Sequence, residues 1–97
     1  MKAIFIPFNQ SYRDQVVEIL ERNDSRGFTF MDDIQGRGTK KGEPHFGTHA
    51  WPTLNSAIIA MVADDKVDNI LEAIKTLDQQ TEKLGLHAFV WNIEKMV

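Results

Sequence analysis

Two histidines four residues apart lie in a polar, glycine-punctuated stretch near the middle of this 97-residue chain. On a helix, the spacing of His45 and His49 would direct both imidazoles at one metal ion. Pro44, Gly47 and Pro52 argue against a regular helix, so the pair depends on a turn or on order imposed by a ligand. Zinc and copper usually take three or four protein ligands, so two histidines make an incomplete metal site. The alternative is that they form hydrogen bonds or titrate without a metal ion.

A second candidate site comes just before the histidines and combines positive charge with accessible backbone amides. It consists of Gly36, Arg37, Gly38, Lys40, Lys41 and Gly42. Amides that are not shielded by side chains can bind an anion, and the basic side chains add charge. The glycine spacing does not match the dinucleotide-binding fingerprint, which would also open a helix rather than a hairpin. The stretch is predicted either to bind an anion or to be a solvated loop.

The rest of the chain offers no catalytic group. It contains no cysteine, which excludes disulfides, thiolate metal ligands and a cysteine nucleophile. Asp32 and Asp33 end a predicted strand without a visible acid–base partner, and no combination of serine, histidine and aspartate suggests a nucleophile. We therefore predict that the protein is not an enzyme.

Composition and charge limit the class of protein further. The net charge of −3 gives no electrostatic basis for binding nucleic acid or an anionic membrane. Apolar residues make up 42% of the chain, enough for one compact domain over residues 1–97. No apolar run is long enough to span a membrane, and Pro7 and Asn9 interrupt the only stretch that resembles a signal peptide. We expect a cytoplasmic protein.

Four strands and two helices are predicted to position the candidate sites. The predicted strands cover residues 2–8, 27–34, 54–63 and 86–93. Ser11 is expected to cap the first helix, and Asp64 or Asp65 the second helix, which is predicted to end at Gly85. The order β-α-β-β-α-β is the split βαβ pattern of ferredoxin-like domains. It predicts an α+β fold with a four-stranded antiparallel sheet and both helices on one face.

The predicted strands carry apolar side chains on both faces. The third strand shows this most clearly, with Ile58, Ala60 and Val62 on one face and Ala57, Ile59 and Met61 on the other. Two helices cover one face only, and a second apolar face in water would be a large exposed hydrophobic patch that favours association. We therefore expect a homo-oligomer packed through its sheets, with Met31 and Met61 as core filler.

The order of short motifs along the whole chain resembles the PII signal-transduction family, whose members are trimeric ferredoxin-like proteins. The first strand ends in Pro7-Phe8, and the second opens on Gly27-Phe28-Thr29. Residues 36–42 match the family's Gly-x-Gly-x-x-Lys-Gly at the root of its long T-loop, and Asp64-Asp65 match the pair before its second helix. The resemblance implies a homotrimer with a T-loop at about residues 36–53.

Two departures from the family pattern bear on its ligands. A glycine-rich B-loop follows the second helix in the family, wraps nucleotide phosphates and ends in a lysine. The corresponding residues 80–87 contain one glycine here, and His87 stands in the place of that lysine. Lys40 stands where the family has a T-loop glutamine that meets 2-oxoglutarate through magnesium. We therefore predict that ATP and ADP bind weakly or not at all.

The resemblance also implies how the histidine pair could be completed. In PII trimers the T-loop of one subunit meets the B-loop of its neighbour, which would bring His87 towards His45 and His49. With an oxygen from Glu43, this set would hold zinc or copper between subunits. Ordering residues 40–52 costs about 1–2 kcal/mol per residue, so we expect them to be mobile until such a ligand binds.

The function expected from these residues is that of a PII-like regulator. Such a trimer would sense a small molecule or a metal ion at inter-subunit clefts. It would then dock through its T-loop on a target protein, either a membrane transporter or an enzyme. Trp51 is either an anchor for that partner or packs over the base of the loop. The alternative is a trimeric metal-binding protein resembling the CutA group, which shares the architecture.

Overall fold

The computed structural model describes residues 1–25, 27–35, 55–80 and 86–97. The strands are β1 (Lys2–Asn9), β2 (Phe28–Ile34), β3 (Asn55–Val62) and β4 (Phe89–Asn92). The helices are α1 (Arg13–Arg22) and α2 (Val67–Gln79), each preceded by a short 3-10 helix, η1 (Gln10–Tyr12) and η2 (Asp64–Lys66). Among the described residues, the order of strands and α-helices is the predicted β-α-β-β-α-β.

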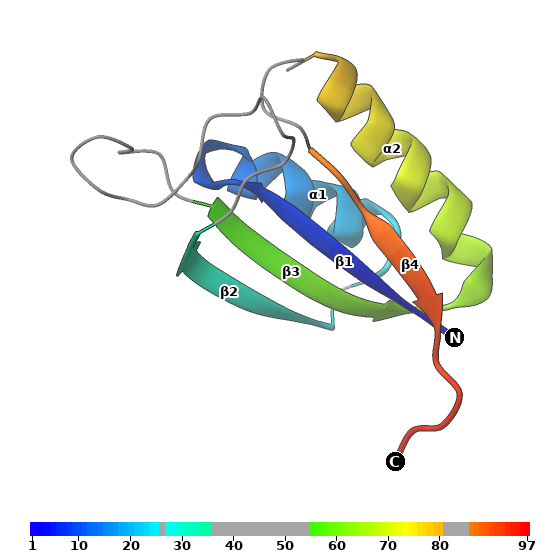
Figure 1. Cartoon of the computed structure of the whole chain (residues 1–97). Coiled ribbons are helices and arrows are strands. Elements are labelled where there is room, and N and C mark those ends of the chain that lie inside the picture. The colour runs from blue at the N-terminus through cyan, green and yellow to red at the C-terminus, as the bar shows by residue number, and fades with distance from the viewer. Residues whose placement is uncertain (26, 36–54, 81–85) are drawn as a thin grey trace.

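The strands form a single antiparallel sheet in the order β2-β3-β1-β4. Both helices lie on the same side of this sheet (Figure 1). The predicted ferredoxin-like arrangement is therefore confirmed. None of the helices in the described part of the chain is long and apolar enough to cross a membrane.

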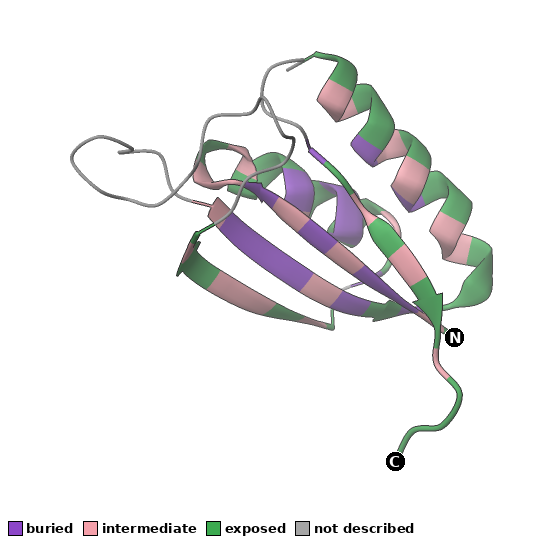
Figure 2. Ribbon diagram, viewed as in Figure 1, coloured by how far each residue is buried: buried purple, intermediate pink, exposed green. Residues whose placement is uncertain are grey.

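The core lies between the sheet and the helices. Alternate residues of the two central strands point towards the helices and are buried, namely Ile4, Ile6, Phe8, Ile58, Ala60 and Val62. The helices meet them with side chains at helical spacing, namely Val16, Ile19, Leu20, Ile70 and Ile74. Figure 2 shows the buried residues concentrated in β1, β3 and the sheet-facing sides of the helices.

The opposite side of the sheet, which we call the outer face, is also apolar. It carries Ala3, Phe5, Ala57, Ile59, Met61, Phe89 and Trp91, as the strand register requires. Both helices lie on the other side, and Met61, Phe89 and Trp91 remain 50%, 52% and 48% exposed. The prediction of two apolar faces is confirmed, whereas Met61 as core filler is wrong for the single chain.

The helix boundaries differ from the predicted ones. The Asn9 side chain, not Ser11, caps the first helical segment by accepting hydrogen bonds from Ser11 N at 3.0 Å and Ser11 Oγ at 2.8 Å. The α2 helix ends at Gln79, before the predicted stop at Gly85, which lies outside the described residues. Asn9 and Ser11 are both good capping residues, so sequence alone did not separate them.

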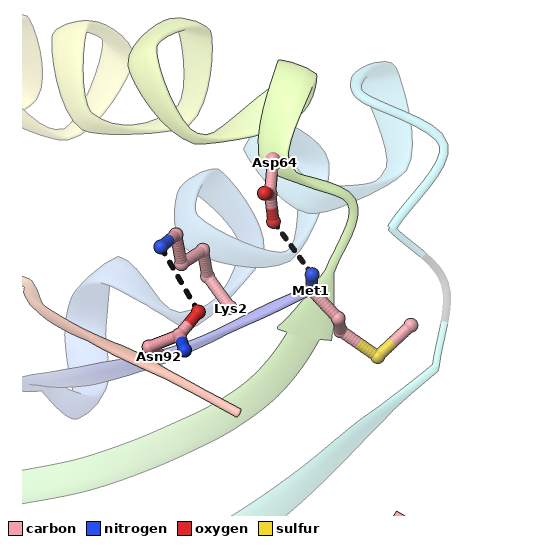
Figure 3. A network of polar contacts seen from close by, with 4 residues as sticks. All are labelled: Met1, Lys2, Asp64 and Asn92. Atoms are coloured by element: carbon pink, nitrogen blue, oxygen red, sulfur yellow. Dashed lines mark hydrogen bonds and ion pairs between the residues drawn. The ribbon is translucent and has the colours of Figure 1, made fainter. Parts of the chain in front are cut away.

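Polar contacts tie the start of β1 to its surroundings (Figure 3). The Met1 amine lies 2.6 Å from Asp64 Oδ1, and Lys2 Nζ donates to Asn92 Oδ1 at 3.1 Å. The hydrogen bond from the amine holds the pKa of Asp64 below its ordinary value. Ile93 N also donates to Met1 O at 3.1 Å. These contacts fix one end of the sheet. The strand ends that flank the candidate sites lie at the opposite end.

Candidate functional site

The strand register brings the anchor points of both candidate sites to one end of the sheet, which we call the loop end. Asn55, at the start of β3, pairs with Ile34 of β2 and with Asn9 of β1. The pairing of Phe89 with Phe5 places residues 86–88 beside the end of β1. The chain therefore leaves β2, enters β3 and enters β4 at the same end of the sheet.

Most of the predicted site residues lie outside the described part of the chain. They are Gly36, Arg37, Gly38, Lys40, Lys41, Gly42, His45 and His49. The predicted T-loop at about residues 36–53 and the predicted mobility of residues 40–52 lie outside it as well. The anion site and the histidine pair therefore stay predictions.

His87 is the predicted metal ligand that the structure describes. It is exposed, and its ring centroid lies 5.9 Å from that of Phe89. The described ranges contain no group of three or more histidine, cysteine or acidic side chains that could hold a metal ion. A metal site at His87 would therefore have to draw ligands from outside these ranges.

Within one subunit, His87 and the start of the predicted T-loop belong to opposite edges of the sheet. His87 precedes β4 and Gln35 follows β2, and these strands are the two edges. Three strand spacings of about 4.8 Å separate the edges by roughly 14 Å. A site that joins His87 to the residues after Gln35 needs either a loop that crosses the sheet end or a neighbouring subunit.

A small cavity of about 240 Å³ lies between the end of α2 and the start of β4. Lys75, Asp78, Leu86 and His87 are among its lining residues. Leu86 N donates a hydrogen bond to the Asp78 carboxylate at 2.9 Å. Asp78, near the end of α2, thereby holds Leu86 in place just before His87.

A polar cluster at the other side of the loop end was missed by sequence reasoning. It consists of Gln10, Asp32, Asp33 and Ser56, and we call it the Asp32 cluster. Asp32 Oδ1 accepts hydrogen bonds from Gln10 Nε2 at 2.7 Å and from Ser56 Oγ at 2.6 Å. The same Gln10 nitrogen donates to Asp33 Oδ1 at 2.5 Å. The available signal in the sequence was Ser56, a polar residue on the helix-facing side of β3, where the other residues are Ile58, Ala60 and Val62.

The backbone of β2 is irregular at this cluster. The pairing moves from Met31 with Ala57 to Ile34 with Asn55, so β2 contains one extra residue. Asp33 adopts a left-handed backbone with φ of 53°, a conformation that aspartate tolerates better than most residues. Asp33 N also donates to Asp32 Oδ1 at 3.0 Å. The Asp32 cluster therefore holds a β-bulge at the point where β2 ends.

The hydrogen bond from Ser56 is the main cause that holds the pKa of Asp32 below its ordinary value. Desolvation acts in the opposite direction, and the Asp33 amide, Gln10 and the charge of Arg13 each lower the pKa further. Arg13 lies with its guanidinium carbon 4.3 Å from the centroid of the Phe30 ring. Asp32 is therefore ionised at neutral pH, and its Oδ1 accepts hydrogen bonds from Gln10, Asp33 N and Ser56.

We expect the Asp32 cluster to make stability depend on pH at the acid end. A group with a lowered folded-state pKa contributes stability above its unfolded pKa of 3.8 and loses it as the pH falls through the lower folded value. Denaturation midpoints measured between about pH 5 and pH 2 should fall, and Asp32→Asn should weaken this dependence. The matched variant Asp65→Asn, at an exposed position, should leave it as in the wild type. An unchanged slope in Asp32→Asn would contradict the role of the cluster.

Comparison with solved structures identifies other proteins that have the same fold. CPII, a nitrogen regulatory PII-like protein from Thiomonas intermedia K12, has been solved with ADP, AMP and bicarbonate. It superposes with a TM-score of 0.76 at 21% identity, covering 95% of this chain and 84% of that chain. The structure of CPII bound to ADP and bicarbonate superposes with a TM-score of 0.77 at 22% identity, again covering 95% of this chain and 84% of that chain.

A second relative is a PII-like signalling protein from Thermus thermophilus. Its TM-score is 0.69 at 18% identity, covering 95% of this chain and 85% of that chain. At these identities the likeness shows the fold alone. No curated protein matches the sequence.

The family assignment comes from the sequence model of a protein family. The model for nitrogen regulatory protein P-II matches residues 1–97, which is the whole sequence. The match includes the segments that frame the loop end of the sheet. The chain therefore belongs to the nitrogen regulatory protein P-II family.

Proposed function

We propose that the protein is a PII-like regulator that senses a small ligand or a metal ion at clefts between subunits. It acts on a target protein through the segment at about residues 36–53. The observation that carries this proposal is the family match over residues 1–97. The sheet supports it by bringing the ends of β2 and β1 and the starts of β3 and β4 to one end.

The proposed assembly is a homotrimer in which the outer face is the buried interface. Phe5 and Phe89 stack on this face with ring centroids 6.4 Å apart, and Ile59 lies between β1 and β2 at its centre. Apolar surface of this kind on a soluble chain marks a site of protein association. A sheet-to-sheet assembly also provides the neighbouring subunit that a shared site at His87 needs.

Adenine nucleotides and bicarbonate are the first ligands to consider, because CPII has been solved with ADP, AMP and bicarbonate. The segment that would contact phosphate here has one glycine, and His87 replaces a lysine of the family pattern. A lysine provides permanent charge to a phosphate, and glycines let amides approach it closely. These differences favour weak nucleotide binding or a ligand of another kind.

We predict that calorimetric titration at neutral pH gives no low-micromolar affinity for ATP or ADP. A hydrogen bond to a charged group is worth about 1.5–3 kcal/mol, so the missing lysine alone weakens binding by roughly 10- to 100-fold. His87→Lys should recover a large part of this loss, whereas the nearby surface variant Gln79→Lys should not. Low-micromolar binding to the wild type would show that residues 80–87 hold phosphate in another way.

The target protein is proposed to be a membrane transporter or an enzyme, with Trp51 as a candidate anchor. The protein itself is proposed to be a cytoplasmic regulator without catalytic activity. A second candidate function is metal binding, as in the CutA group. The exposure of His87 at the loop end favours it, because that imidazole is accessible to a metal ion.

A further inference from the structure

An open groove lies between α1 and β2, on the side of the sheet opposite the outer face. Its volume is about 480 Å³, and its lining comes from α1 and β2 alone. The strand register points Phe28 and Phe30 to the helix side of the sheet, where Val17 of α1 joins them. These three side chains are only partly buried, so the groove has an apolar floor that the chain itself leaves open.

Carboxylates make up most of the charged rim of this groove. Asp14, Glu18 and Glu21 line it from exposed positions of α1, against a single cation, Arg13. The Arg13 guanidinium carbon lies 4.3 Å from the centroid of the Phe30 ring, so Arg13 occupies that end of the groove. At a helical rise of about 1.5 Å per residue, Glu18 and Glu21 lie about 7 and 12 Å further along α1. The end away from Arg13 is therefore acidic.

This acidic end is available to a second cation. Glu18 Oε1 lies 4.0 Å from Arg22 Nε, and the two side chains are 67% and 61% exposed. An exposed pair at that distance contributes little, so a cation from another molecule can replace Arg22. A lysine or arginine side chain fits the groove with its stem on the apolar floor and its charge at the carboxylates.

The strand that forms this floor is also free to pair. β2 is an edge of the sheet (Figure 1), and β3 is its only partner among the described strands. Residues 28–31 contain no proline or lysine, and the bulge that would block pairing comes only after Met31. An extended segment that pairs with this edge would place every second side chain on the helix side, at the groove.

The charge of the groove indicates which partner would pair there. Two copies of this chain joined through their β2 strands would bring two acidic rims together, and like charges that close repel. A different protein with basic residues is attracted instead. The groove and the edge strand therefore favour one kind of ligand, an extended chain that carries positive charge.

We propose that the groove between α1 and β2 docks an extended basic segment of a partner protein. The segment adds a strand to β2 and places lysine or arginine side chains at Asp14, Glu18 and Glu21. This surface lies on the other side of the sheet from the outer face of the proposed trimer. The inference goes beyond the proposed function, because it needs neither the trimer nor the sensed ligand.

The probe is a fluorescent peptide that alternates lysine with threonine over about six residues, the usual length of a strand. Fluorescence anisotropy at low salt should show that the wild type binds it, and that the peptide with glutamate in place of lysine does not bind. The backbone amide signals of residues 28–31 should shift in the isotope-labelled protein, whereas those of β4, the other edge strand, should not. No binding at millimolar peptide, or shifts at β4 instead, would overturn the inference.

The double variant Glu18→Gln, Glu21→Gln removes two carboxylates of the rim. It should bind the lysine peptide about three- to tenfold more weakly than the wild type does. The matched control Asp65→Asn, Glu72→Gln removes two exposed carboxylates outside the groove and should bind as the wild type does. Equal weakening in both would mean attraction to the whole protein and would overturn the inference. Circular dichroism checks that both variants keep the wild-type helix content.

Two further peptides separate strand addition from attraction between charges alone. One carries N-methyl groups on its lysine amides and the other on its threonine amides, so both keep the same side chains and charge. Successive amides of a strand point to opposite edges, so only one of the two sets can face β2. One isomer should therefore lose binding while the other keeps it. Equal affinity of the two isomers would overturn strand addition.

Other occupants of the groove give different results. Spermidine should displace the peptide far less well than unlabelled peptide does. Equal displacement would show that the ligand is a free polyamine and would overturn the inference. Light scattering should give the same mass for the wild type and for Glu18→Gln, Glu21→Gln. A changed mass would show that the groove is an interface between copies, which would also overturn it.

Discussion

Replacing Ile59 with aspartate is expected to split the proposed trimer into monomers or to unfold the chain. Ile59 lies at the centre of the outer face, paired with Phe5 on one side and Thr29 on the other. An ionised carboxylate enclosed in an apolar interface without a partner costs on the order of several kcal/mol, and a trimer would contain three. Light scattering after size-exclusion chromatography at micromolar concentration measures the mass, and circular dichroism separates dissociation from unfolding.

The control for this variant is Asn69→Asp, which makes the same change of charge at an exposed position of α2. It should keep both the mass and the helix content of the wild type, because its carboxylate stays in water. A wild type that is a stable monomer at micromolar concentration would contradict the assembly. A trimeric Ile59→Asp protein would instead show that the interface does not use the outer face.

Zinc, copper or nickel is expected to stabilise the wild type near pH 7.5 and to lose this effect near pH 5. Histidine imidazoles titrate near pH 6.5 in model peptides, and only the neutral ring can bind a metal ion. A metal at 100 times its dissociation constant adds about 2.7 kcal/mol to the free energy of unfolding. For a domain of this size, each kcal/mol raises the melting temperature by about 4–8 °C, so the expected shift exceeds 10 °C.

The double variant His45→Ala, His49→Ala should show no metal-dependent shift at either pH. His87→Ala tests separately whether this third imidazole completes the site, and it should weaken the response near pH 7.5. If the double variant is stabilised as much as the wild type, these histidines do not bind the metal. Ligand sensing would then depend on an anion at Arg37, Lys40 and Lys41.

The element order and the two apolar faces could be predicted because both are local patterns. Near-continuous apolar runs in β1 and β3 and helical spacing in α1 and α2 are written into consecutive residues. The boundaries were less certain, because they depend on which of several polar groups reaches a free amide. Asn9 does so ahead of Ser11, and the structure assigns strand to β4 over Phe89–Asn92 only, half of the predicted 86–93.

The sequence also identified His87 as a candidate metal ligand, but it did not show where His87 lies in the fold. Only the strand order β2-β3-β1-β4 shows that it precedes one edge strand while Gln35 follows the other. The spacing between histidines in the sequence carries no such information, because the distance between two edges depends on how the intervening strands pair.

The sequence by itself determined the fold class, because burial of apolar side chains at periodic positions leaves few arrangements for two helices and four strands. The Asp32 cluster was decided only by the tertiary structure. Asp32 meets Gln10 and Ser56 across 22 and 24 residues, and the meeting requires the β-bulge, the left-handed Asp33 and the short η1 helix together. Hydrogen bonds act only over about 3 Å, so they depend on the final register of the strands rather than on any pattern within one of them.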